Sequence, residues 1–316
     1  MNVKQIFKIA LDEGVKNDLR GPAKVKKQLQ RVKDKYKKLT PEQQGKFDQD
    51  KLNNPYLDSQ ILYDNGKPVK KIMAGIDIDT AELLVAKQMG DIDLVFAHHP
   101  DGKAFANLSD VMPMQVEVLE KYGVPINVAQ GCLRMRVEEV ARGVSPINHF
   151  KTVDAAKNLD INFMCVHTMC DNLVARFLEK EIAKKKFEYV GEIMEFFSKI
   201  PEYVEARKRG FGPKLFAGTE ENFCGKIALT EITGGTSGSP KIFEKLAQAG
   251  VGTIIGMHMS EEGKKEAEKN HINVIIAGHI SSDSLGVNLL LDILEQKGCE
   301  IVPCSGLIRV KRKINN

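Results

Sequence analysis

Two adjacent histidines, His98 and His99, end an apolar stretch (residues 91–97) and are followed at once by Pro100. Neighbouring side chains of a regular strand point to opposite faces of a sheet, so adjacent histidines seldom share one small site. A strand that is broken by a proline turns there, and the two imidazole rings can then splay toward two centres. That arrangement suits a pair of metal ions better than a single ion. An exposed pair of loop histidines is the simpler alternative.

Two further groups of metal-ligand residue types also follow expected strands. His167 and Asp171 come just after one apolar stretch, and His279 and Asp283 come just after another. In open α/β sheets, sites form outside the carboxyl ends of the strands, so groups that are far apart in the chain can meet there. The i, i+4 spacing of both pairs places the side chains on one face where a helix begins.

Imidazole and carboxylate ligands without thiolates suit zinc, iron, manganese or nickel better than copper(I) or an iron–sulfur cluster. Four histidines and two aspartates exceed what one tetrahedral zinc ion needs. They would serve two divalent ions about 3.5–4 Å apart, with one carboxylate bridging them. Each residue alone also has a structural explanation, and for Asp77 and Asp79 a strand-to-helix cap is the simpler one. Three coincident groups at strand ends nevertheless favour a metal site.

Gly234, Gly235 and Gly238 belong to a glycine-rich turn, residues 234–240, between an expected strand and an expected helix. Backbone amides in such a turn can form a nest that binds an anion at the start of the helix. A phosphate-containing small molecule is therefore a candidate ligand. The turn lacks the Gly-Lys-Ser/Thr ending of a nucleotide P-loop, and a tight turn that requires glycine explains it as well.

The elements that must position these groups alternate between strand and helix from about residue 70. Strands are expected at 69–78, 91–97, 125–129, 159–166, 226–232, 252–256, 272–277 and 300–303. This alternation predicts an α/β fold with mostly parallel sheets covered on both faces. The chain then divides into a basic helical N-terminal extension (1–60), a first α/β lobe (61–175), a connecting segment (176–225) and a second α/β lobe (226–316).

Length and composition are those of a soluble protein with about two domains, since 316 residues with 42% hydrophobic content can form sizeable cores. No apolar run is long enough to span a bilayer, and the N-terminus has no export signal. The six cysteines include no C-x-x-C pair, which favours reduced thiols. We therefore expect a cytoplasmic protein that does not enter a membrane.

Charge is unevenly distributed along the chain. Residues 1–40 hold twelve Lys/Arg and four Asp/Glu, a local charge of +8, whereas the whole chain carries +4. Such a segment could contact nucleic acid. However, aromatic residues are not interleaved with the basic ones, and Val25, Leu29, Val32 and Tyr36 recur at helical spacing. A solvated amphipathic helix is therefore the favoured interpretation.

Four motifs carry a resemblance to a known family. His98-His-Pro100, His167-Thr-Met-Cys-Asp171, Gly234-Gly-Thr-Ser-Gly238 and Ala277-Gly-His-Ile-Ser-Ser-Asp283 occur in this order. Together they resemble the Nif-three-like family (NGG-one-interacting factor three homologues), many of whose members are labelled GTP cyclohydrolase I type 2 homologues. The resemblance covers roughly residues 60–316, and the His-His-Pro and Gly-His-x-x-x-acid motifs are its specific part.

The resemblance implies two similar three-layer α/β lobes that face each other across a cleft, a dinuclear metal site and a toroidal homohexamer. His98, His99, Asp171, His279 and Asp283 match the ligand positions of the family. His167 opens the second motif, where it would orient a ligand from behind.

The sequence departs from the family pattern at three positions. Asp283 stands where the family usually has glutamate, so its shorter side chain leaves a bridging role open. The Thr-Gly-acid motif of the family is replaced by Ile255-Gly256-Met257, beside which His258 either lines the site or ends a strand. Cys170 places a thiol near the expected ligands, although inward packing explains it more simply.

Two functions remain in view for such a site. A metal-dependent hydrolase could act on a phosphate-containing or nucleotide-like small molecule, with His167 or His258 as proton carrier. A non-enzymatic metal-binding or regulatory scaffold is the alternative, because fold does not establish chemistry.

Overall fold

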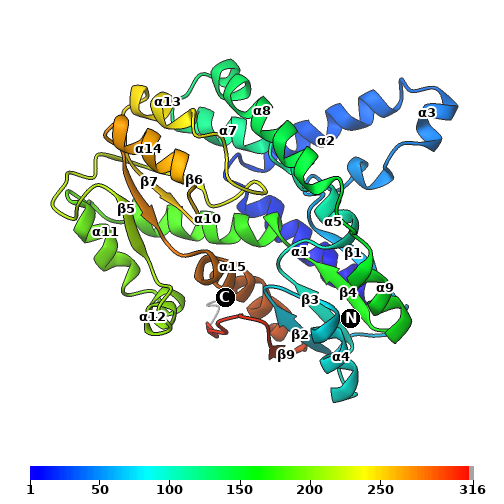
Figure 1. The fold of residues 1–316 in the computed structure, drawn as a ribbon. Coiled ribbons are helices and arrows are strands. Elements are labelled where there is room, and N and C mark those ends of the chain that lie inside the picture. Colours follow the sequence, from blue (N-terminus) through cyan, green and yellow to red (C-terminus); the bar gives the residue numbers. More distant parts are fainter. Residues whose placement is uncertain (313–316) are drawn as a thin grey trace.

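The computed structural model describes residues 1–312 of the chain and contains two β-sheets surrounded by helices (Figure 1). The first sheet has five strands in the order β1-β4-β3-β2-β9. Their bounds are β1 (Gln60–Tyr63), β2 (Lys71–Gly75), β3 (Leu94–Ala97), β4 (Asn162–Cys165) and β9 (Glu300–Pro303). All pairs are parallel except β1 with β4, so an antiparallel strand forms one edge.

The second sheet has four strands in the order β5-β8-β7-β6. Their bounds are β5 (Lys214–Ala217), β6 (Lys226–Glu231), β7 (Val251–Gly256) and β8 (Asn273–Ile276). Here too a single antiparallel strand, β5, forms an edge, and the other pairs are parallel. The predicted α/β fold with mostly parallel sheets is confirmed. The facing, three-layer arrangement of two lobes stays a prediction.

Helices account for most of the remaining ordered chain. They are α1 (Val3–Asn17), α2 (Pro22–Tyr36), α3 (Pro41–Gly45), the 3₁₀ helix η1 (Gln49–Leu52), α4 (Thr80–Met89), α5 (Gly102–Ala106), α6 (Leu108–Val111), α7 (Met114–Lys121), α8 (Ile126–Val144), α9 (Lys151–Leu159), α10 (Thr168–Ala183), α11 (Val190–Phe197), α12 (Pro201–Lys208), α13 (Ile242–Gln248), α14 (Glu261–Lys269) and α15 (His279–Gln296). Within residues 1–312, none of them has the length and apolar character needed to cross a bilayer.

Two of these helices, α10 and α15, lie between the sheets (Figure 1) and contribute to both main cores. They pack closely because Gly286 of α15 faces the α10 backbone. A Cβ at Gly286 would lie 2.3 Å from the Cys170 carbonyl oxygen, so any larger residue would push the two helices apart. This close approach fixes the N-terminal parts of α10 and α15 relative to each other. Asp171 lies in the first turn of α10, and Asp283 lies one turn into α15.

The N-terminal helix α1 is also part of the folded body. Val3, Ile6 and Ala10 are fully buried in the core beneath the first sheet, and α1 packs against α10. The side chain of Asn2 caps the helix and accepts a hydrogen bond from the Gln5 amide, which satisfies one of its free N–H groups.

Four strand assignments differ from the sequence interpretation. Residues 125–129 were expected as a strand but open α8, because a short apolar run next to a proline does not distinguish strand from helix. The antiparallel edge strands β1 and β5 were not expected. The last strand, β9, falls in the range assigned to the second lobe yet pairs with β2 in the first sheet. The four-part division of the chain otherwise stays a prediction.

Candidate metal centre

The metal-ligand candidates all follow the carboxyl ends of parallel strands. His98 and His99 come directly after β3, and Asp171 lies in the first turn of α10, just after β4. His279 begins α15, just after β8, and Asp283 lies one turn further along that helix. The first sheet and the second sheet therefore both contribute side chains to one region.

The inner part of this cluster consists of three buried side chains. His98 Nε2 lies 3.4 Å from Asp171 Oδ1 and 3.4 Å from Asp283 Oδ1. The His98 and Asp283 side chains are fully buried, and the Asp171 side chain is 2% exposed. These three atoms form one group that could hold a metal ion.

The outer part of the cluster uses the second oxygen of Asp283. Asp283 Oδ2 lies 3.3 Å from His99 Nε2 and 3.6 Å from His279 Nε2. The His99 side chain is 24% exposed and the His279 side chain 39%, so this side of the cluster reaches solvent. The three residues form a second group that could hold a metal ion. Each oxygen of Asp283 thus faces a different set of histidines, in spite of its short side chain.

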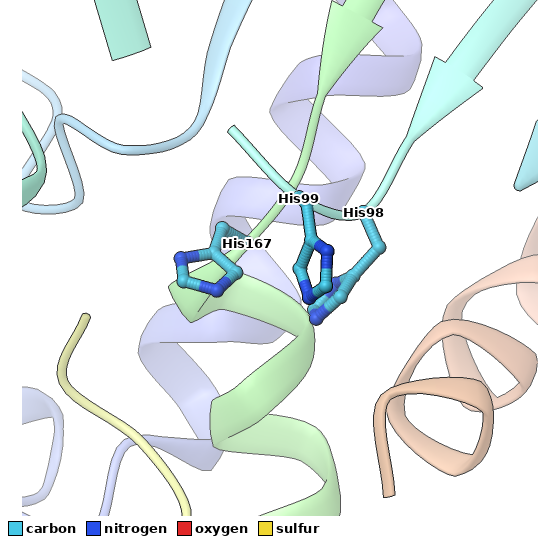
Figure 2. A group of neighbouring side chains, drawn as sticks. All are labelled: His98, His99 and His167. Atoms are coloured by element: carbon cyan, nitrogen blue, oxygen red, sulfur yellow. The ribbon is translucent and has the colours of Figure 1, made fainter. Parts of the chain in front are cut away.

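His167 lies closer to the other histidines than an orienting role requires. Figure 2 shows its ring at the start of α10, beside the rings of His98 and His99 from the loop after β3. Its ring centroid is 5.1 Å from that of His98 and 5.8 Å from that of His99. The three imidazoles form a third group with metal-ligand spacing.

Hydrogen bonds to Nδ1 fix the orientation of these three rings. His167 Nδ1 contacts Asp58 Oδ2 at 2.8 Å, and that oxygen also accepts a hydrogen bond from the Thr168 hydroxyl at 2.6 Å. His98 Nδ1 contacts the Val166 carbonyl oxygen at 3.1 Å. When Nδ1 donates its proton to such an acceptor, Nε2 is left with the lone pair that a metal requires.

The third orienting contact joins His99 Nδ1 and Asp77 Oδ1, which are 2.6 Å apart. A helix cap was the simpler explanation for Asp77, but the cap of α4 is Asp79 alone. Sequence reasoning also missed Asp58, which it left inside the N-terminal extension. No local pattern marks Asp58, because its contact to His167 spans 109 positions of the chain.

The polar atoms of the cluster show how well a cation would fit. His98 Nε2, His99 Nε2, Asp171 Oδ1 and both carboxylate oxygens of Asp283 are buried and have no hydrogen-bond partner among the described residues. Leaving a buried polar group unsatisfied costs about 1–3 kcal/mol, and more for a charged one. Metal ions would satisfy these lone pairs at once, so the residues present fit a bound metal.

The electrostatics of the cluster point the same way. Burial lowers the pKa of His98, but the carboxylates of Asp283 and Asp171 outweigh burial and hold that pKa well above its usual range. Burial also opposes protonation of His99, yet the nearby carboxylates of Asp283 and Asp77 raise its pKa to about 9. For Asp283 itself, burial favours the neutral acid, but the two histidines bring its pKa far below its usual range. The carboxylates therefore favour positive charge at the centre.

His258 and Glu231 lie beside the cluster but outside the three groups. The His258 ring is 5.3 Å from the His279 ring, and its Nδ1 is buried without a hydrogen-bond partner among residues 1–312. Burial, reinforced by His279, lowers the pKa of His258 to about 4, so this ring is neutral near pH 7. Burial raises the pKa of Glu231 to about 7. Both residues line a cavity of about 10 Å³ that also contacts Asp171.

The glycine-rich turn packs against α7 and its flanking residues. Gly234 and Gly235 have φ values of +101° and +90°, and a Cβ at Gly234 would lie 2.8 Å from the Gln115 side chain. Gln115 Nε2 donates hydrogen bonds to the carbonyl oxygens of Gly234 and Thr236. The Gly238 amide donates to the Glu231 carboxylate at 3.2 Å. These contacts give the glycines a packing role, and anion binding by the turn stays a prediction.

The fold and the cluster define a class of protein: an α/β protein with two parallel-rich sheets and a buried His/Asp centre that could hold metal ions at the strand ends. No protein-family model and no curated protein sequence matches the chain. A NIF3 superfamily protein from Sphaerobacter thermophilus is similar in structure, with a TM-score of 0.74 and 25% sequence identity. The similarity covers 97% of this chain and 99% of that one.

Two other solved structures show weaker similarity. Reduced HcgD from Methanocaldococcus jannaschii has 17% identity and a TM-score of 0.46, over 78% of this chain and 87% of its own. The protein ybgI, of unknown function, has 15% identity and a TM-score of 0.48, over 87% and 95% of the two chains. Neither score is high enough to carry an argument. The Sphaerobacter match, taken with the motifs, supports assignment of this chain to the Nif3-like family.

Proposed function

We propose that this protein binds two divalent metal ions at the His/Asp centre and is a hydrolase of a phosphate-containing or nucleotide-like small molecule. The observation that carries the proposal is the convergence of five buried imidazole and carboxylate atoms that lack a hydrogen-bond partner among residues 1–312. They come from segments that follow strands of both sheets. Groups of this kind are expensive to leave without a cation, and their donor set suits zinc, iron, manganese or nickel.

The proposed ligands divide between the two oxygens of Asp283. His98, Asp171 and Asp283 Oδ1 would hold one ion, and His99, His279 and Asp283 Oδ2 would hold the other. His167 would orient the inner set or complete it, because Asp58 holds its ring toward His98. The bridging role of Asp283 rests on this division of its oxygens.

Two ions, when bound, would supply positive charge to polarise a phosphoryl oxygen and to lower the pKa of a water molecule. The residues of the chain would perform the remaining tasks. His99 and His279 lie on the side that reaches solvent, where a substrate can approach. His258 is neutral near pH 7 and its buried Nδ1 has no hydrogen-bond partner among residues 1–312, so this ring would be the proton acceptor. The phosphate-containing substrate is suggested by the family resemblance and by the two-ion chemistry.

The test begins with purified full-length protein that is stripped with a chelator and reloaded separately with zinc, manganese, iron(II) or nickel. Elemental analysis and an anomalous-scattering map would give the number, identity and position of the ions. A panel of phosphate esters and nucleotides then tests turnover. The proposal requires metal-dependent hydrolysis that is lost in His98→Ala, and a protein that takes up no metal under these conditions contradicts it.

A metal-binding scaffold without turnover is the second candidate, and one observation favours it. The cavity that joins Asp171, Glu231 and His258 has a volume of only about 10 Å³. Pockets for small-molecule ligands commonly measure about 300–1,000 Å³. Full metal loading without turnover on the whole panel would select this alternative. The proposed homohexamer is a separate question, which light scattering of the purified protein would answer.

A further inference from the structure

Helix α2 exposes a row of basic side chains on its solvent side. Lys27, Arg31 and Lys35 follow one another at intervals of four residues, and Lys38 follows in the turn after the helix. Intervals of three and four place side chains on the same helix face. All four are exposed, and none forms an ion pair within residues 1–312. We refer to these four residues as the basic row.

The positive charge of this region is not neutralised locally. Residues 22–39 contain eight Lys/Arg and a single acidic residue, Asp34. Asp34 accepts a hydrogen bond from Gln30 rather than pairing with a cation. The next acidic residue along the chain, Glu42, pairs with Lys46, and Asp48 and Asp50 both bind Lys103 on α5. The basic row therefore keeps its full charge.

The helix that carries the basic row is fixed to the body of the protein. Its apolar side faces inward through Val25, which is 1% exposed, and Lys24 pairs with Glu120 of α7 at 2.7 Å. After α3 the chain is tied down again, where Lys51 of η1 pairs with Asp110 at 2.7 Å. Figure 1 shows α2 and α3 projecting away from both sheets. A partner would thus meet a preformed surface and would not have to order it.

We propose that the basic row binds the phosphate backbone of nucleic acid, without sequence preference, at a site separate from the metal centre. The eight helical steps from Lys27 to Lys35 span about 12 Å at 1.5 Å per residue. That length matches three to four phosphates along one strand, at about 3.4 Å each.

A duplex fits this surface better than a single strand. Proteins that bind single strands commonly stack bases on exposed aromatic rings. The α2 helix has one aromatic residue, Tyr36, and its ring packs against Phe47 with the centroids 5.0 Å apart. The row therefore offers charge without a stacking platform, and charge alone reads the backbone rather than the bases.

The experiment measures binding of the full-length protein to a labelled mixed-sequence DNA duplex of roughly 24 base pairs by fluorescence anisotropy, at several salt concentrations. Four phosphate contacts predict a slope of log K against log salt of about −3.6, or about 100-fold weaker binding at 200 mM than at 50 mM salt. The test variant is Lys27→Gln/Arg31→Gln/Lys35→Gln/Lys38→Gln. It should bind at least 10-fold more weakly at low salt and lose most of the slope.

A matched control removes the same charge from another exposed surface, in Lys184→Gln/Lys185→Gln/Lys186→Gln/Lys208→Gln. It should keep the wild-type slope, and both variants should keep the wild-type melting temperature and metal content. An RNA duplex, a DNA single strand of the same length and polyglutamate are compared in the same assay.

Three results would overturn the proposal. The wild-type protein could fail to bind either duplex at low salt, or the control could lose as much affinity as the test variant. Preference for polyglutamate over both duplexes would instead assign the row to an acidic protein. The test does not measure hydrolase activity, so its result is independent of the proposed function.

Discussion

The inner and outer halves of the metal centre use the same residue types in different surroundings. The side chains of His98, Asp171 and Asp283 are at most 2% exposed. Those of His99 and His279 are 24% and 39% exposed. An inner group has no water to replace a missing ligand, while an outer group can be hydrated. The inner half is therefore expected to hold its ion more tightly.

The histidine pKa values express the same difference. His98 meets two carboxylates, which outweigh its burial and raise its pKa well above the usual range. His279 meets Asp283, but burial outweighs this contact and its pKa is lowered. Burial opposes the charged form of both rings. The carboxylates overcome this effect at His98 but not at His279.

The largest effect is expected when the residue shared by both halves is removed. Asp283→Ala should lower metal content from about two ions per chain to nearly none, because each oxygen of Asp283 faces one half. Elemental analysis of protein reloaded with zinc measures this directly. Asp283→Asn, which keeps the shape but loses the charge, serves as the control for folding. Retention of one ion in the alanine variant would show that the halves do not share this ligand.

A smaller effect is expected when only the outer half is damaged. His279→Ala should leave about one ion per chain, since the inner set of His98, Asp171 and Asp283 is untouched. A zinc titration by calorimetry should lose its weaker event and keep the tighter one. If instead the tighter event disappears, the ranking of the two halves is reversed.

The orienting carboxylates should separate the halves more finely. Asp58 is fully buried behind His167, whereas the Asp77 side chain is 69% exposed behind His99. Loss of such a partner commonly weakens metal binding by about 10–100-fold. We expect Asp58→Asn to lie near the upper end of that range and Asp77→Asn near the lower end, in competition titrations with a chromogenic chelator. Equal effects would mean that burial of the orienting group is unimportant.

The smallest expected effect concerns Glu231, a half-buried acid at the end of β6 whose carboxylate accepts a hydrogen bond from the Gly238 amide. Burial raises its pKa to about 7, so the carboxyl group of the folded protein stays protonated up to about that pH. In the unfolded chain the same group loses its proton near pH 4–5. Its contribution is therefore most favourable at low pH and declines as pH rises toward 7. Glu231→Gln should raise the free energy of unfolding at pH 8 by about 1–3 kcal/mol and change it little at pH 4.5. Urea unfolding of the metal-free wild-type protein and variant at both pH values tests this. A substitution that changes the free energy of unfolding equally at pH 8 and pH 4.5 contradicts it.

Local sequence patterns were sufficient to predict that the main ligand candidates lie close together. Apolar stretches followed by His or Asp predicted that His98, Asp171 and Asp283 would meet at strand ends, because parallel strands share one carboxyl edge. A helix cap in the region of Asp79 and an amphipathic helix that carries Val25 and Tyr36 were predicted in the same way. Each of these features depends on residues only a few positions apart.

Features that depend on distant contacts could not be predicted. The orienting partner of His167 is 109 positions away, and β1 and β5 pair with strands roughly 100 and 60 positions away. Whether residues 125–129 form a strand or a helix depends on the packing of the whole of α8 and not on these first residues alone. The different environments of His98 and His279 likewise arise only from the completed fold.

The position of β9 has a consequence for how the chain assembles. Strand β2 pairs on one side with β3, only about twenty residues away, and on the other with residues 300–303. During synthesis on the ribosome, that flank of β2 stays uncovered until nearly all of both sheets has emerged. Exposed strand edges invite pairing with other chains, so a nascent polypeptide halted before residue 300 should be prone to aggregate.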